Sequence, residues 1–218
     1  MDISYSGGMD STALAIWAKQ QGHDITLHFA DTGAELPETL WFIPRAAMVL
    51  GAKLIVHQFA SFFQIFVKRG YLPSYRVRYC TKELKSKALD EKYAVGICAD
   101  ESHRSPELYR PLVENNISSI DARKLCEKAD LVNPIYEWRT HSSCFCCPFQ
   151  RKSDWLGMNK KHPYLYALAE QWEAISIESG HKIMFHDTYS LKQLREAKES
   201  EIDLFPEECD KACSICLW

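Results

Sequence analysis

Apolar and polar positions follow two alternating periods along the first hundred residues. Short apolar runs of β-type residues are each followed by a segment in which apolar residues recur at helical spacing. Gly22 and Gly51 directly follow two of these segments and predict where the helices end. Strand and helix in regular alternation predict a parallel sheet with crossover helices. The predicted strands cover 1–5, 25–30, 53–57 and 94–99, and the predicted helices 10–21, 38–50, 61–70 and 81–92.

The pattern weakens after residue 100. Four prolines within 103–148 predict a loop-rich stretch. Residues 153–179 are helical in pattern, and the His162-Pro163 pair within them predicts that a new helix starts there. A polar helix is expected over 191–200, ahead of a cysteine-rich tail.

Composition and charge then narrow the class of protein. The chain has 218 residues, of which 46% are hydrophobic and 25% charged, which is typical of a globular protein with a real core. A net charge of -3 argues against a protein whose whole surface binds nucleic acid. The 26 Lys and Arg residues are still enough for a local basic patch. Apolar runs are too short to span a membrane, and the start of the chain lacks a secretion pattern. We therefore expect a cytoplasmic protein.

Nine cysteines are many for this length, and six of them are clustered. Without a secretion pattern, such clusters indicate metal ligation before disulfides. Cys98 and Cys126 stand alone in mixed apolar surroundings and are expected to be buried thiols. The two clusters are Cys144, Cys146 and Cys147, and Cys209, Cys213 and Cys216.

The strongest motif is the string from Ser6 to Ser11 at the first predicted strand-to-helix junction. Gly7 and Gly8 allow positive φ angles and a close approach of the backbone to an anion. The start of the following helix presents unpaired N–H groups and the positive end of its dipole, where phosphate binds readily. The Ser6 and Ser11 hydroxyls are expected to add hydrogen bonds. Asp10 is expected to hold Mg²⁺ between phosphate oxygens.

This string resembles the PP-loop of ATP pyrophosphatases, a group that includes sulfonucleotide reductases and tRNA-thiolating enzymes. A second string, Asp31-Thr32-Gly33 followed by 37–39, is similar to the segment after the second strand of phosphoadenosine phosphosulfate (PAPS) reductases. The resemblance implies that Asp31, Thr32 and Gly33 contact the phosphate or ribose of the nucleotide. It also implies an α/β, Rossmann-like adenine nucleotide alpha-hydrolase fold with a parallel five-stranded sheet. In this fold a nucleotide-binding domain would cover 1–135, and a helical, cysteine-rich lobe 136–218.

A basic stretch surrounds Cys80. Arginine forks bind oxyanions in bidentate fashion, so this stretch is a candidate cationic lid over phosphate or sulfate. Its order resembles the basic segment of the reductases, which implies that Arg78 and Lys82 contact the anion, with Lys82 in a catalytic role. Reductases with an iron–sulfur cluster carry a cysteine pair here, whereas this chain has Tyr79-Cys80.

The segment after the fourth predicted strand also resembles the family. The resemblance implies that backbone near Gly96 contacts the adenine. Glu101 and Arg104 would face the reacting phosphate end, with Arg104 catalytic. A surface loop with an ordinary Glu–Arg pair is the alternative.

The cysteine clusters indicate a soft metal, because crowded thiolates repel one another unless a metal neutralises them. The Cys144-x-x-Cys147 spacing suits either Zn²⁺ or an iron–sulfur cluster. With Pro148 and the following Asp154-Trp155-Leu156, it resembles reductase-like proteins of phages and DNA phosphorothioation systems, which implies a [4Fe–4S] cluster. Four ligands are needed and more are available, so Cys146 or Cys209 is a candidate free thiol. The expected metal ligands are Cys144, Cys147, Cys209, Cys213 and Cys216.

Three functions follow from these strings. The first is ATP cleavage with release of pyrophosphate and adenylation of an acceptor in sulfur transfer. The second is reduction of PAPS to sulfite, which the absence of the reductases' Glu-Cys-Gly tail disfavours. The third is a metal-stabilised nucleotide-binding module without turnover. The expected partners are an adenine nucleotide with Mg²⁺, and a nucleic acid or sulfur-donor protein; the sequence leaves a homo-oligomer open.

Overall fold

In the computed structural model, which describes residues 1–74, 76–86, 92–181 and 183–206, a parallel sheet lies at the centre of the N-terminal part. Among these residues the sheet has four strands in the order β3-β2-β1-β4. Ile3 pairs with Leu27 on one side and Ala94 on the other. The strands are β1 (Asp2–Ser4), β2 (Thr26–Ala30), β3 (Lys53–His57) and β4 (Ala94–Val95).

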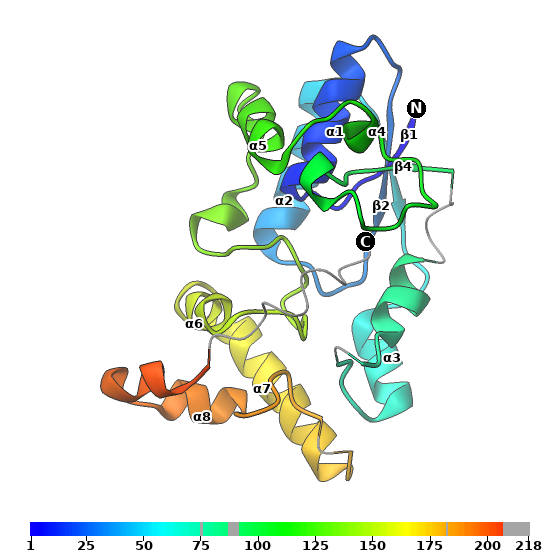
Figure 1. The fold of residues 1–218 in the computed structure, drawn as a ribbon. Helices are drawn as coiled ribbons and strands as arrows, with labels where there is room; N and C mark the ends of the chain where they lie inside the picture. Colours follow the sequence, from blue (N-terminus) through cyan, green and yellow to red (C-terminus); the bar gives the residue numbers. More distant parts are fainter. Residues whose placement is uncertain (75, 87–91, 182, 207–218) are drawn as a thin grey trace.

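Three helices gather on one side of this sheet (Figure 1). They are α1 (Met9–Gln20), α2 (Pro37–Leu50) and α5 (Ser119–Lys128). Leu14 of α1 and Phe42 of α2 are fully buried with Leu27 in one hydrophobic cluster. The α2 helix begins with a proline in its first turn and ends at Gly51, whose φ of 59° is left-handed. The alternating pattern of the sequence therefore does form a parallel α/β layer, as expected.

The structure corrects the sequence interpretation in three places. The described residues contain four strands where five were expected, and the fourth is limited to Ala94–Val95. The helix expected over 81–92 begins as a π-helical turn, Thr81–Lys85, and 87–91 lie outside the described residues. The stretch 103–148 is not merely loop, because it contains α5, the short α4 (Pro111–Glu114) and a 3₁₀ turn, Pro134–Glu137.

A second hydrophobic cluster joins the C-terminal helices to α3 (Phe62–Arg69). The Trp172 ring lies 5.3 Å from the Phe62 ring, 5.6 Å from that of Phe66 and 5.3 Å from that of Phe145. In Figure 1 the C-terminal helices lie together, away from α1 and α5. The division of domains at residue 135 stays a prediction. These helices are α6 (Lys152–Lys161), α7 (Pro163–Glu178) and α8 (Leu191–Glu196), followed by a 3₁₀ turn, Glu199–Leu204.

None of the helices that the structure describes is both long enough and apolar enough to cross a membrane.

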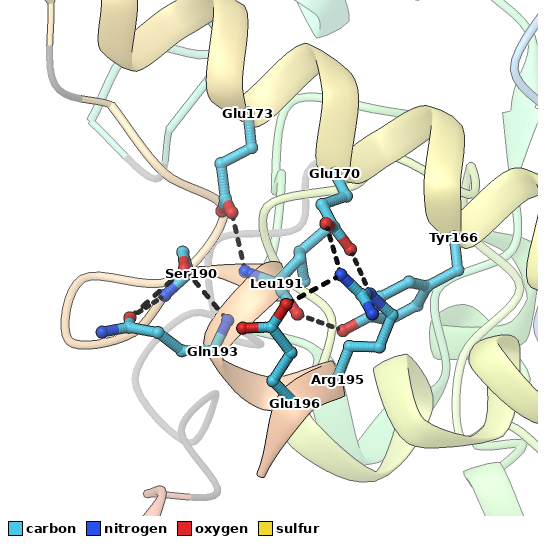
Figure 2. Close-up of polar contacts among 8 residues, drawn as sticks. All are labelled: Tyr166, Glu170, Glu173, Ser190, Leu191, Gln193, Arg195 and Glu196. Atoms are coloured by element: carbon cyan, nitrogen blue, oxygen red, sulfur yellow. Dashed lines mark hydrogen bonds and ion pairs between the residues drawn. The ribbon is translucent and has the colours of Figure 1, made fainter.

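Figure 2 shows how α7 holds the start of α8. The Glu173 carboxylate accepts a hydrogen bond from the Leu191 amide at 2.6 Å, and the Tyr166 hydroxyl donates to the Leu191 carbonyl at 2.7 Å. Arg195 of α8 pairs with Glu170 of α7 at 2.8 Å. A buried carboxylate thus takes the place of water at the first turn of α8.

This buried carboxylate predicts a pH-dependent stability. Burial raises the pKa of Glu173 from 4.5 to about 6, although amide hydrogen bonds from Phe185 and Leu191 lower it. Because the folded-state pKa lies above the unfolded value, the folded protein binds the proton more tightly. The contribution of Glu173 to the free energy of unfolding should therefore fall by about 2 kcal/mol in total as pH rises from well below 4.5 to well above 6. Urea unfolding at several pH values measures it.

The control is Glu173→Gln, which does not titrate. Other carboxylates contribute equally to the pH dependence of both proteins, so the difference between them isolates this group. Parallel curves for wild type and variant would show that Glu173 ionises in the folded protein as it does in water.

Candidate functional site

The loop between β1 and α1 has the backbone shape that the glycine pair predicts. Gly7 has a φ of 72°, and a Cβ atom there would lie 3.0 Å from a side-chain carbon of Ile43. Gly8 is the N-cap of α1. Both positions therefore favour glycine, the first for its conformation and the second for the space around it.

The two serines of the loop hold its shape. The Ser11 hydroxyl donates to the Gly8 carbonyl at 3.1 Å and lies 3.2 Å from the Ser6 hydroxyl. The Ser6 side chain in turn accepts from the Gly8 amide at 3.3 Å. Their expected contact with phosphate stays a prediction.

Two residues from 133–136 contact the loop, and the sequence analysis did not find them. The Asn133 amide group donates to the Gly7 carbonyl at 2.9 Å, and the Met9 amide donates to the Tyr136 hydroxyl at 2.9 Å. Asn133 and Gly7 are more than a hundred residues apart, so no local pattern signals the contact.

A cleft of about 520 Å³ opens above this loop. That volume falls within the range of about 300–1,000 Å³ found for small-molecule and cofactor sites. The cleft brings together most of the residues that the sequence analysis selected. Those that line it are Ser6, Gly8, Asp10, Ser11, Thr32, Arg78, Gly96, Glu101, Arg104, Cys144 and Cys147.

Among the selected residues that the structure describes, four are not among the cleft-lining residues: Gly7, Asp31, Gly33 and Lys82. Gly7 lies behind the loop against Ile43. The Asp31 carboxylate accepts from the Gly33 amide at 2.8 Å, so this string is a local turn that presents Thr32. Lys82 is exposed.

Asp10 sits in the first turn of α1, half-buried in the cleft. Burial raises the pKa of its carboxyl, a hydrogen bond with Cys98 lowers it, and the nearby Glu101 charge raises it further. Arg104 forms an ion pair with Glu101. Burial makes the ionised form of this carboxylate costly, and a bound cation would offset that cost.

Gly96 contributes by its lack of a side chain. A Cβ atom there would lie 2.5 Å from the Ser11 nitrogen and 2.7 Å from the Asp10 carbonyl oxygen. The end of β4 thus packs directly against the first turn of α1. Its expected contact with adenine stays a prediction.

Four cysteines line one part of the cleft, which we call the thiol end: Cys80, Cys144, Cys146 and Cys147. The Cys144 sulfur lies 3.6 Å from the Thr32 hydroxyl. Cys80 is distant in sequence, yet its charge and that of Cys144 affect each other. The structure therefore adds Cys80 to the thiols that the sequence analysis grouped.

Lys85 is a cation beside these thiols. The Cys144 charge raises the pKa of the Lys85 ammonium, burial lowers it, and the Glu35 charge raises it again. Glu35 is held by the Thr32 hydroxyl at 2.6 Å. Lys85 lines the cleft whereas Lys82 does not. Lys85 is therefore better placed than Lys82 to contact a group bound in the cleft.

A buried arginine donates hydrogen bonds to the backbone of the cysteine loop, the segment that carries Cys144, Cys146 and Cys147. Arg139 is 4% exposed and donates to the Ser143 carbonyl at 2.9 Å and to the Cys144 carbonyl at 3.2 Å. Asp154, which is 1% exposed, accepts from the Thr140 amide at 2.9 Å and stands near the arginine charge. The Asp154-Trp155-Leu156 string therefore supports the cysteine loop.

Glu38 and His162 join α2 to the C-terminal helices. The Glu38 carboxylate lies 2.8 Å from the His162 ring and accepts from the Trp138 indole at 3.0 Å. Burial alone would raise the pKa of Glu38, but the hydrogen bonds from His162 and Trp138 lower it overall. These contacts give Glu38 a role in joining the two parts.

The donor set at the thiol end suits a soft metal, because thiolates are the ligands that zinc and iron–sulfur clusters prefer. Within the described residues, however, no three Cys, His, Asp or Glu side chains are arranged to hold a metal ion. The expected ligands Cys209, Cys213 and Cys216 lie outside the described residues.

Lys85 predicts the reactivity of Cys144. Burial raises the pKa of the Cys144 thiol and the Lys85 charge lowers it. In metal-free protein, Lys85→Met should therefore slow alkylation of Cys144 by iodoacetamide at pH 7.5 about 10-fold, because less of the thiol is ionised. Peptide mass spectrometry measures the rate. Lys82→Met is the matched control and should leave the rate unchanged; equal effects of the two variants would contradict the assignment.

Comparison with known proteins identifies relatives of this chain and its family. The chain is 23% identical over 192 residues to the uncharacterised protein MJ0973 of Methanocaldococcus jannaschii, covering 76% of this chain and 46% of the relative. It is 28% identical over 206 residues to MJ0066 of the same organism, covering 83% and 42%. The chain thus spans less than half the length of either relative.

Among solved structures, the U34-tRNA thiolase NcsA from Methanococcus maripaludis with its [4Fe-4S] cluster is similar at 12% identity and a TM-score of 0.39, covering 100% of this chain and 80% of that one. Residues 1–141 match the phosphoadenosine phosphosulfate reductase domain. This match covers the loop, the cleft-lining segments after β2 and β4, and the basic stretch, and it confirms the resemblance found in the sequence. The chain therefore belongs to the phosphoadenosine phosphosulfate reductase domain family.

Proposed function

We propose that this chain binds an adenine nucleotide in the cleft and, in sulfur transfer, adenylates an acceptor with release of pyrophosphate. The observation that carries the proposal is the loop from Ser6 to Ser11, which opens into a cleft of about 520 Å³ at the start of α1. Helix N-termini with glycine-rich loops bind phosphate through backbone amides. Family membership supports the same nucleotide class.

The cleft residues divide the work of such a reaction. The loop amides would stabilise the leaving pyrophosphate as its charge develops. Asp10 would hold Mg²⁺, which travels with the nucleotide and offsets phosphate charge. Arg78 and Arg104 line the cleft and would be further contacts for the anion. We assign to Lys85, in place of Lys82, the cationic role that the basic stretch predicts.

The thiol end of the cleft would hold a [4Fe–4S] cluster, with Zn²⁺ as the alternative. Cys144 and Cys147 line the cleft beside Cys80, and Cys209, Cys213 and Cys216 complete the proposed donor set. A bound cluster would supply a site where sulfur is held close to the nucleotide.

Residues 202–205, which precede the tail cysteines, are hydrogen-bonded to a lysine that lies close in sequence to the Cys144–Cys147 loop. The Lys152 ammonium donates to the Phe205 carbonyl at 2.9 Å and to the Ile202 carbonyl at 3.2 Å. Lys152 follows Cys147 by five residues. This anchoring supports a shared metal centre.

A second candidate function is reduction of PAPS to sulfite, favoured by the family match itself. That reaction needs two electrons from thiols, and the cleft places several thiols near the loop. Incubation with each nucleotide distinguishes the two. AMP and pyrophosphate from ATP, in the presence of an acceptor, support adenylation; sulfite from PAPS supports reduction. Tight nucleotide binding with neither product would leave a binding module.

The compartment and partners follow from the same chemistry. We place the protein in the cytoplasm, where thiols are kept reduced and available to ligate a metal. The acceptor is a nucleic acid or another macromolecule that brings its own sulfur-accepting atom into the cleft, with a separate sulfur-donor protein.

A further inference from the structure

The first amide of α1 is already engaged by a side chain that the sequence analysis did not select. The Met9 amide donates to the Tyr136 hydroxyl oxygen at 2.9 Å. Burial raises the pKa of the Tyr136 hydroxyl, while its hydrogen bond with Ser142 and the one from Met9 lower it. Tyr136 therefore stays neutral at physiological pH. It accepts from the helix start on one side and contacts Ser142 on the other.

Ser142 lies directly over the glycine pair. A Cβ atom on Gly8 would be 2.5 Å from the Ser142 hydroxyl oxygen and 3.6 Å from that of Tyr136. Ser142 lines the main cleft and also an adjoining cavity of about 50 Å³, which Lys85 and Cys144 line as well. The serine hydroxyl thus stands between the phosphate loop and the thiols.

The direction of these hydrogen bonds gives the pair a chemical character. A phenol hydroxyl accepts through its oxygen and donates through its own hydrogen, so Tyr136 can accept from the Met9 amide and still donate to Ser142. When Ser142 accepts a hydrogen bond from Tyr136, the serine's own hydrogen is left to donate into the cleft. Hydrogen bonds in series polarise one another. The positive potential at the N-terminus of α1 therefore makes the Tyr136 hydroxyl a stronger donor, and Ser142 in turn.

We propose that Ser142, oriented by Tyr136, donates a hydrogen bond to an oxygen of the nucleotide's reacting phosphoryl or sulfuryl group, and so positions that group between the loop and Cys144. This inference rests on the proposed function, since it adds a subsite to the same cleft. Tyr136 is a positioning residue that acts through Ser142.

Binding of a charged nucleotide and of its neutral nucleoside tests the pair. Dissociation constants for ATP and for PAPS are measured by calorimetry, and that for adenosine by ligand-observed NMR, on the full chain. Ser142→Ala should weaken whichever charged nucleotide the wild type binds about 10-fold, because it removes a hydrogen bond to a charged group, and should leave adenosine unchanged. Tyr136→Phe should have a smaller effect of the same kind.

Because the two hydroxyls act in series, the double variant should lose no more affinity than Ser142→Ala alone. Tyr79→Phe is the matched control. It removes a buried hydroxyl that donates to the Tyr71 carbonyl at 2.7 Å, away from the loop, and should leave both affinities unchanged.

Each contrary result is decisive. Equal weakening of nucleotide and adenosine would give the pair a structural role and overturn the inference. Tighter nucleotide binding by Tyr136→Phe would mean that the tyrosine competes with phosphate for the Met9 amide, which also overturns it. Unchanged affinities in Ser142→Ala would overturn the inference while the proposed function stands. A wild type that binds no adenine nucleotide would overturn both.

Discussion

Replacing Asp10 with Asn should lower magnesium-dependent pyrophosphate release by about 100-fold or more, while the protein stays at least as stable as the wild type. Asparagine has the shape of aspartate but lacks the charge that, in the proposed reaction, would bind Mg²⁺. The fold does not need that charge, because burial raises the pKa of the Asp10 carboxyl and so makes its ionised form costly. Steady-state pyrophosphate release at saturating ATP and urea unfolding measure the two effects.

The matched control for this substitution is Asp100→Asn. Asp100 lies near Asp10 in the structure, but it is exposed and accepts from the Ser119 amide at 2.8 Å and from its hydroxyl at 2.6 Å. Its loss should cost some stability at the start of α5 and leave turnover intact. If Asp10→Asn kept full turnover, the carboxylate would have no part in the chemistry. If the wild type bound nucleotide without turnover, the chain would be a binding module.

The parts of the site that the sequence predicted are those in which neighbours in the chain are neighbours in space. The string from Ser6 to Ser11 forms one turn, closed by hydrogen bonds among its own residues. Residues after β2 and β4 reach the same cleft because parallel strands end at one edge of the sheet. Such placements follow from local pattern and topology together.

The basic stretch shows why its resemblance to the reductases selected Lys82, which does not line the cleft, and not Lys85, which does. Lys82 and Lys85 are three residues apart, a spacing that shares one face in a regular α-helix. Here the turn is π-helical, with the Ser86 amide bonded to the Thr81 carbonyl five residues back. The wider turn separates the two side chains, so Lys85 lines the cleft and Lys82 is exposed.

Other parts depend on contacts between distant segments. Tyr136 reaches Met9 and Glu38 reaches His162 across more than a hundred residues, so no window of sequence shows them. The missed helix α5 is different, because a signal was present. Ser118 and Asp121 form a capping box at its start, and that pair is readable from the sequence three residues apart. The prolines within 103–148 predict a loop, and this prediction conflicts with the helix signal.

Replacing Gly96 with Ala should destabilise the protein by about 1–3 kcal/mol and weaken nucleotide binding more than 10-fold, because the added methyl group overpacks the junction of β4 and α1. The new Cβ atom would lie 2.5 Å from the Ser11 nitrogen and 2.6 Å from the Asp10 carbonyl carbon. These are backbone atoms of one helical turn, so no change of rotamer relieves the contact. The turn must move, and it carries Asp10 and Ser11 with it.

Gly180→Ala separates this effect from the general cost of losing a glycine. Gly180 has a φ of 86°, and a Cβ atom there would meet nothing within 4 Å. The control should therefore cost only the strain of a left-handed residue, about 1 kcal/mol, and leave nucleotide affinity unchanged. Urea unfolding and calorimetric titration with ATP or PAPS compare the two variants. If Gly96→Ala bound nucleotide as the control does, the first turn of α1 would tolerate displacement, and the close packing of β4 against it would not be what sets the phosphate loop in place.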